Sequence, residues 1–155
     1  MAKRDLAELR IPANSTFIPV AKRVASTLGS QLGLSLTDLD ELSIALTQAC
    51  DSAIDAADDF GGDHDLKLTY FATNRALVVD VDLLPALHQA SRHSAEAVAK
   101  HRELVDVEMQ RLAYEMIRCF VDDFRTQIEP RTGQVRFRMV KHLAGLRSHR
   151  ARKLK

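Results

Sequence analysis

The chain has 155 residues, of which 46% are hydrophobic and 28% charged, and its formal net charge is +1. This length and composition are typical of one soluble globular domain that buries about 70% of its unfolded surface. The sequence contains no run of about 18 apolar residues and no apolar segment close behind its first residues, which argues against a membrane span and a secretory signal. We therefore expect a cytoplasmic protein.

Charged residues are unevenly distributed along the chain. Eleven acidic and two basic residues lie between Asp38 and Asp82, whereas residues 131–155 hold nine Lys or Arg and no acid. This separation indicates either two solvated faces, two surfaces for different partners, or a basic tail that visits the acidic face. We expect a folded domain at 1–146 and a disordered basic tail at 147–155.

The N-terminal part predicts a strand followed by a helix. Residues 6–11 alternate between apolar and polar side chains up to a proline, which predicts a short strand. Apolar residues then recur at helical spacing over 17–28, and Gly29 and Gly33 are expected to end this helix.

A second helix is the clearest element of the sequence. Ser35 or Thr37 is expected to cap it, and it should run to about Ala57 and stop before a Gly-Gly pair. Cys50 lies in its apolar stripe, and Cys119 lies in a similar pattern further on, so both are expected to be buried, reduced thiols.

The remaining sequence predicts two pairs of strands separated by a helix. The segments are a hairpin at 66–70 and 76–82, a loose helix or loop at 85–102, a firm helix at 105–120, and strands at 121–128 and 135–139. The stripe of the firm helix that should face the core includes Met109, Leu112 and Met116. The order predicts an α+β fold, a two-layer α/β sandwich whose mixed, mostly antiparallel sheet has its helices on one face.

Clusters of potential metal ligands lack the spacing of a metal site. The histidines are expected to be surface residues, and the acidic cluster a solvated loop, so we expect no metal. The residues concerned are His64, His88, His93 and His101, and Asp58, Asp59, Asp63 and Asp65.

Several local strings resemble the anti-sigma-factor serine kinases of the GHKL ATPase superfamily, which share the histidine-kinase-like ATPase fold. The family's "L-x-L-P-A", "A-V-x-E-A-C-x-N-A-x-x-H" and "G-T-x-V-R-L-V-K" motifs are matched by residues 9–13, 45–55 and 132–141. The resemblance covers about residues 9–143. It implies a regulator that binds a sigma factor and an anti-anti-sigma factor, and that forms a homodimer.

The resemblance also implies what the residues of the kinase site should be. The family has a catalytic Glu and a Mg²⁺-binding Asn where this chain has Gln48 and Ser52. Gln cannot accept a proton as a general base, and a Ser hydroxyl is a weaker metal ligand than an Asn carbonyl. A vestigial nucleotide site would consist of Ser52, Asp55, Asp80 and Asp82.

The two glycine motifs of the family are altered as well. Its adenine-reading "D-x-G-x-G" corresponds to residues 80–83, where Leu83 or Leu84 replaces bare backbone. Its phosphate-binding "G-x-G-L" is best matched by Arg111-Leu112-Ala113-Tyr114, and no glycine lies between Gly62 and Gly133.

Three functions remain open on the sequence alone. The first is an anti-sigma-like binding protein without kinase activity, which needs no ATP or Mg²⁺. The second is an active or weakly active serine kinase of an anti-anti-sigma factor. The third is a regulator that binds nucleic acid through its basic tail, although the tail lacks the aromatic residues typical of single-strand binders.

Overall fold

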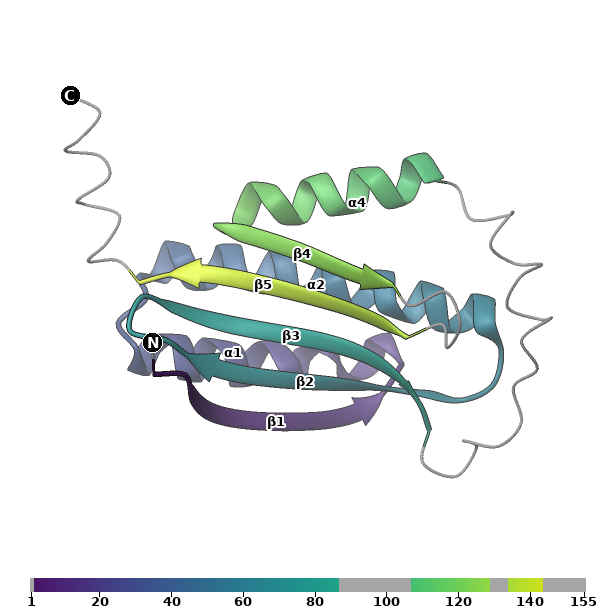
Figure 1. Ribbon diagram of the computed structural model, residues 1–155, viewed down its shortest axis with the longest axis horizontal. Coiled ribbons are helices and arrows are strands. Elements are labelled where there is room, and N and C mark those ends of the chain that lie inside the picture. The colour runs from purple at the N-terminus through teal and green to yellow at the C-terminus, as the bar shows by residue number, and fades with distance from the viewer. Residues whose placement is uncertain (1, 87–106, 129–133, 144–155) are drawn as a thin grey trace.

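The computed structural model describes residues 2–86, 107–128 and 134–143, which form a helical layer on a β-sheet (Figure 1). The elements in chain order are β1 (Arg4–Pro12), the short 3-10 helix η1 (Ser15–Phe17), α1 (Ile18–Gln31), α2 (Leu36–Phe60), β2 (His64–Ala72), β3 (Ala76–Pro85), α4 (Val107–Phe120), β4 (Asp123–Ile128) and β5 (Val135–His142). The predicted fold class and element order are confirmed.

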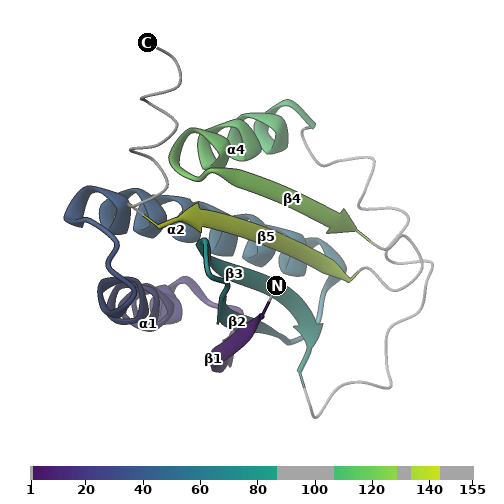
Figure 2. The same cartoon turned by 60° about the vertical axis from the view of Figure 1, so that its left-hand side comes forward.

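The sheet has the strand order β1-β2-β3-β5-β4, and each of its four strand pairings is antiparallel. The expectation of a mostly antiparallel sheet is thus correct, and the described strands include no parallel pair. Helices α1, α2 and α4 lie on one side of the sheet, as expected (Figure 2). The opposite face of the sheet carries no helix of the described chain.

Alternation along the strands decides which side chains enter the core. On β5, Val135, Phe137 and Met139 are buried against the helices, while Arg136 and Arg138 point to the opposite face. The main core continues through apolar residues of β2, β3, α1 and α2. On the far side of the core, the Tyr70 hydroxyl donates to the Ala21 carbonyl of α1 at 2.9 Å, which ties β2 to that helix.

Helix α2 begins with a capping box. The Asp38 backbone N–H donates to the Ser35 hydroxyl at 3.1 Å, and the Asp38 carboxylate accepts from the Ser35 backbone N–H at 3.4 Å. Ser35, rather than Thr37, is therefore the cap. The helix continues to Phe60, three residues past the predicted end, and Gly61 follows it with a φ of 67°.

The prediction that Gly29 ends the first helix is wrong. Helix α1 continues through Gly29 to Gln31, and Gly33 follows with a φ of 85°. A Cβ atom on Gly29 would lie 2.6 Å from the Leu39 side chain and 2.9 Å from that of Leu34. The glycine therefore permits close approach of α1 to the start of α2.

The expected core stripe of α4 is also partly wrong. Met109, Leu112 and Met116 are 67%, 62% and 46% exposed, whereas Ile117 is buried. The helix lies at the edge of the molecule against α2 and β4, so neighbouring elements cover only a narrow side of it (Figure 1).

The two cysteines differ for the same reason. Cys50 is buried in the core, as predicted, but Cys119 is exposed on α4, contrary to prediction.

Some predictions fall outside the described residues. These are most of the expected helix or loop at 85–102, His88, His93, His101 and the basic tail at 147–155. Within the described ranges, no helix is long and apolar enough to cross a membrane.

Candidate functional site

The candidate kinase-site residues of α2 share one side of that helix. Gln48, Ser52 and Asp55 are spaced four and three residues apart, which aligns their side chains along the helix. Gln48 and Ser52 are half-buried and Asp55 is exposed. The apolar stripe of α2, which includes Leu46 and Ala53, packs into the core and fixes the rotation of the helix.

The chemistry that this row of side chains offers is limited. The Gln48 amide can donate and accept hydrogen bonds, but it has no group that takes up a proton near neutral pH. Ser52 offers a single hydroxyl as a metal ligand or hydrogen-bonding partner. The row is therefore suited to polar recognition and poorly suited to activating a nucleophile.

The C-terminal half of α2 carries carboxylates without basic partners. The whole helix contains no Lys or Arg, and no ion pair joins Asp51, Asp55, Asp58 or Asp59 to a base in the described parts of the chain. Partial burial, followed by the charges of Asp51, Asp58 and Asp59, raises the pKa of Asp55. Partial burial likewise raises the pKa of Asp51. This surface attracts cations and repels a triphosphate.

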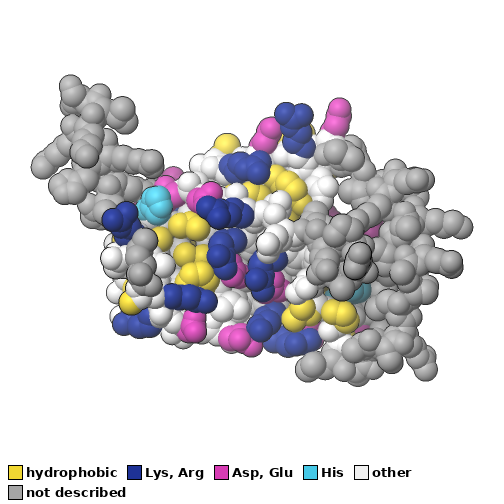
Figure 3. All heavy atoms as spheres, in the orientation of Figure 1, with side chains coloured by type: hydrophobic (Ala, Val, Ile, Leu, Met, Phe, Trp, Pro, Cys, Tyr) yellow, Lys and Arg dark blue, Asp and Glu magenta, His cyan; other side chains and the backbone are white. Residues whose placement is uncertain are grey.

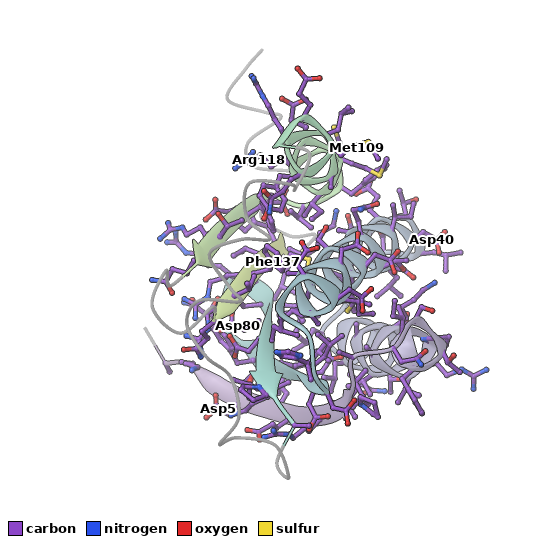
Figure 4. The ribbon with its side chains drawn as sticks, turned by 90° about the vertical axis from the view of Figure 1, so that its right-hand side faces the viewer. Asp5, Asp40, Asp80, Met109, Arg118 and Phe137 are labelled. Carbon is purple, nitrogen blue, oxygen red and sulfur yellow. The ribbon has the colours of Figure 1, made fainter. Side chains whose placement is uncertain are left out.

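The structure places Asp80 and Asp82 away from this row. Both lie on β3 between Val79, Val81 and Leu83, which face the helices, so the two carboxylates belong to the opposite face of the sheet. Figure 4 shows Asp80 on the sheet side of the molecule and Asp40 of α2 on the helix side. The four residues of the predicted nucleotide site are thus not brought together, and only Ser52 and Asp55 share a surface.

On the sheet face, both aspartates are held by arginines of β5. Arg138 Nε and Nη2 donate to the Asp80 carboxylate at 2.7 and 2.8 Å, and Arg136 makes the same paired contact with Asp82 at 2.5 and 3.1 Å. Hydrogen bonds to these carboxylates raise the pKa of both guanidinium groups. Figure 3 shows the resulting band of basic side chains across the sheet.

The residues at the altered glycine motifs have structural positions of their own. Leu83 is 2% exposed and packs in the main core, while Leu84 is half-buried. The Arg111–Tyr114 string lies inside α4, more than a turn after its first described residue. Its backbone N–H groups therefore belong to the helix interior and are not free to wrap a phosphate.

Lys141 was not predicted as a site residue, but the structure makes it a junction of three elements. Its side chain is 1% exposed, and its Nζ donates to Glu41 at 2.5 Å and to the Phe120 carbonyl at 2.7 Å, with Asp38 at 3.8 Å. It thus joins β5 to the start of α2 and the end of α4. The available clue was an isolated Lys at an inward position of an alternating strand.

The metal-ligand candidates of the sequence have other positions. Asp65 pairs with Arg10 at 2.9 Å, and His64 Nδ1 lies 3.3 Å from the Gly62 carbonyl oxygen. Within the described ranges, no three His, Cys, Asp or Glu side chains are arranged to hold a metal ion.

Comparisons with known proteins agree with the family resemblance. The chain is 28% identical over 75 residues to the serine-protein kinase RsbW of Halalkalibacterium halodurans, which covers 48% of this chain and 46% of that protein. It is 26% and 23% identical over 77 residues to the proteins of the same name in Bacillus velezensis and Bacillus subtilis, covering 48% of each chain. The chain thus spans about half the length of the curated relatives it matches, and no family model matches it.

These matches agree with the observed element order and with the motif strings at residues 9–13, 45–55 and 132–141. The chain is thus similar, at 23–28% identity over about half its length, to proteins named serine-protein kinase RsbW.

Proposed function

We propose that this chain is a regulatory binding protein of the anti-sigma-factor kind, which sequesters a sigma factor or binds an anti-anti-sigma partner without transferring phosphate. Its relatives are named serine-protein kinases, so the family resemblance suggests regulation through protein partners. The residues of α2 argue against the kinase step itself.

Gln48 is the observation that carries this proposal. The family resemblance places it where a glutamate accepts the proton of the attacking hydroxyl, and an amide cannot do so. It lies half-buried on α2.

The charge of the surrounding surface supports the same conclusion. Asp51 and Asp55 flank Ser52, and α2 provides no Lys or Arg to bind phosphate oxygens. ATP would bring several negative charges to a surface where neighbouring carboxylates already contribute to the raised pKa of Asp55. Binding of protein partners therefore fits this face better than binding of a nucleotide.

Binding is tested by gel filtration of the purified protein with each sigma factor and each anti-anti-sigma homologue of its host. We expect one stable complex, and the elution volume of the protein alone tests the homodimer that the resemblance implies. Absence of a complex with every candidate partner would overturn the binding proposal.

Catalysis is tested by calorimetry with Mg-ATP and by transfer of labelled phosphate to the anti-anti-sigma partner. We expect no transfer by the natural chain. A double variant, Gln48→Glu with Ser52→Asn, restores the two family residues, and Gln31→Glu at the exposed end of α1 is the matched control. Transfer by the natural chain would favour the alternative of an active kinase.

A further inference from the structure

Helices α2 and α4 present large apolar side chains to solvent on the side of the molecule away from the sheet. Ile44 of α2 is 45% exposed, and Leu112 and Met116 of α4 are similarly uncovered. Figure 4 shows Met109 of α4 and Asp40 of α2 on this same side. We call the surface of Ile44, Leu112, Met116, Asp51 and Asp55 the α2–α4 face.

The α2–α4 face is apolar near the start of α2 and acidic toward the end of that helix. The end of α4 lies beside the start of α2, because Lys141 contacts both Glu41 and the Phe120 carbonyl. The apolar side chain of Ile44 therefore lies near this junction, and the carboxylates from Asp51 onward lie further along the helix. An occupant of the face should be apolar first and then basic.

The carboxylates at the far end of the face are unfavourable for the helix that bears them. Asp58 and Asp59 stand in the last turn of α2, where the helix dipole disfavours negative charge. Local violations of this kind are expected where a sequence serves binding rather than folding. An occupant of the α2–α4 face that compensates these carboxylates must therefore carry several positive charges.

The chain supplies such charges from the same junction. β5 ends one residue after Lys141, and residues 144–155 follow Leu143, the last described residue. Their sequence has Leu146 first and then five Lys or Arg with no acid. Its order of apolar and basic residues matches that of the α2–α4 face.

The length of the segment is sufficient. Twelve residues span up to about 40 Å when extended. Asp51 and Asp59 lie about 15 Å and about 27 Å further along α2 than Glu41, at the rise of an α-helix. Every carboxylate of the series is therefore within reach of a segment that starts at the junction, with length to spare for its path around the helix.

We propose that residues 144–155 dock on the α2–α4 face of their own chain, with Leu146 on the apolar part and the basic side chains against Asp51, Asp55, Asp58 and Asp59. The docked segment covers the surface beside Gln48 and Ser52. It acts as an internal competitor for any partner that uses this face, and its attachment weakens as salt screens the charges.

The test measures proximity in the full chain. A nitroxide is attached at Lys155→Cys in a Cys119→Ser background, where Cys50 stays buried and unlabelled. NMR at about 25 mM salt should then show at least a threefold loss of intensity at the amides of residues 51–59, and the loss should disappear at about 500 mM salt.

Variants separate specific docking from general attraction. The fourfold variant Asp51→Asn, Asp55→Asn, Asp58→Asn and Asp59→Asn should abolish the intensity loss. The control, Asp5→Asn with Glu8→Gln on β1, should keep it. Loss of intensity elsewhere, equal effects of both variants, or no loss at low salt would overturn the proposal.

A mixed sample decides whether docking occurs within one chain. Labelled chains without ¹⁵N are combined with unlabelled ¹⁵N chains, and we expect no intensity loss in the latter. A loss of equal size in the mixed sample would show docking on a second copy and would overturn the intramolecular contact.

Discussion

Acidic residues occur in two contrasting settings in this molecule. On the sheet, Asp80 and Asp82 are 6% and 3% exposed, and each is held by both donor atoms of an arginine fork. At the C-terminal half of α2, the carboxylates from Asp51 to Asp59 lie closer to solvent and form no ion pair with a Lys or Arg of the described chain.

The paired carboxylates of the sheet stabilise the fold, whereas the unpaired carboxylates at the end of α2 do not. A buried carboxylate needs its partner, because removing one member of the pair leaves an uncompensated charge in a poorly solvated place. The carboxylates from Asp51 to Asp59 have no such role, and their mutual repulsion opposes folding slightly. Their presence is therefore better explained by binding.

The largest expected effect comes from the most buried pair. Lys141→Met should destabilise the protein by about 3 kcal/mol, because Glu41 and Asp38 lose their cation and the Phe120 carbonyl loses a donor. Urea denaturation measures the change. Lys22→Met on α1 is the control and should change stability by less than about 0.5 kcal/mol. Equal changes in the free energy of unfolding for the two variants would mean that the contacts of Lys141 do not stabilise the fold.

A smaller loss is expected on the open face of the sheet. Arg138→Ala should destabilise the protein by about 2 kcal/mol, because the Asp80 carboxylate loses two hydrogen bonds and Phe71 loses the guanidinium 5.4 Å from its ring centre. Arg125→Ala on β4 is the control, since its partner Asp123 is exposed and the pair is worth little. Thermal unfolding that ranks the two variants in the reverse order would contradict this assignment.

The sequence was sufficient where one periodicity dominated. Val135, Phe137 and Met139 alternate strictly, and the stripe of α2 is continuous, so both elements and their buried faces were predicted. The sequence was insufficient where position in the fold decides exposure. Met109 and Cys119 fit an apolar stripe, but α4 lies at an edge and is covered on one side only.

The candidate site was predicted in part for a related reason. Gln48 and Ser52 were found because helical spacing aligns them. Asp80 was grouped with them although the alternation of β3 turns it to the other face, toward Arg138. The alternation of β3 already separates Asp80 from the inward residues Val79 and Val81, but the family motif that grouped it with Ser52 takes no account of strand alternation.

The unpaired carboxylates predict a small gain when one is removed. Asp55→Asn should stabilise the protein by about 0.5 kcal/mol at pH 7, a value reduced for the exposure of this side chain. The raised pKa of Asp55 means that the folded state binds its proton more tightly than the unfolded state does. The penalty in the natural chain should therefore shrink as the pH falls through that pKa, and the variant should lack this dependence.

Asp40→Asn provides the matched control for this gain. Asp40 lies just past the first turn of the same helix, where the dipole still weakly favours a negative charge, so its removal should cost at most a few tenths of a kcal/mol. Urea denaturation at pH 4 and pH 7 compares the two variants. A loss of stability from both would show that the carboxylates of α2 act alike, and would remove the contrast between the two ends of the helix.

The smallest expected effect is that of the Asp51 charge on the reactivity of the buried Cys50 thiol. Burial, and secondarily the charge of Asp51, raises the pKa of Cys50 to about 12. Iodoacetamide at pH 8.5 should therefore modify Cys119 and leave Cys50 unmodified in the folded protein. Asp51→Asn should leave Cys50 unmodified as well, because burial is the larger cause and blocks access of the reagent. Modification of Cys50 in that variant at a rate near that of Cys119 would show instead that the carboxylate, and not the packing around the thiol, protects it.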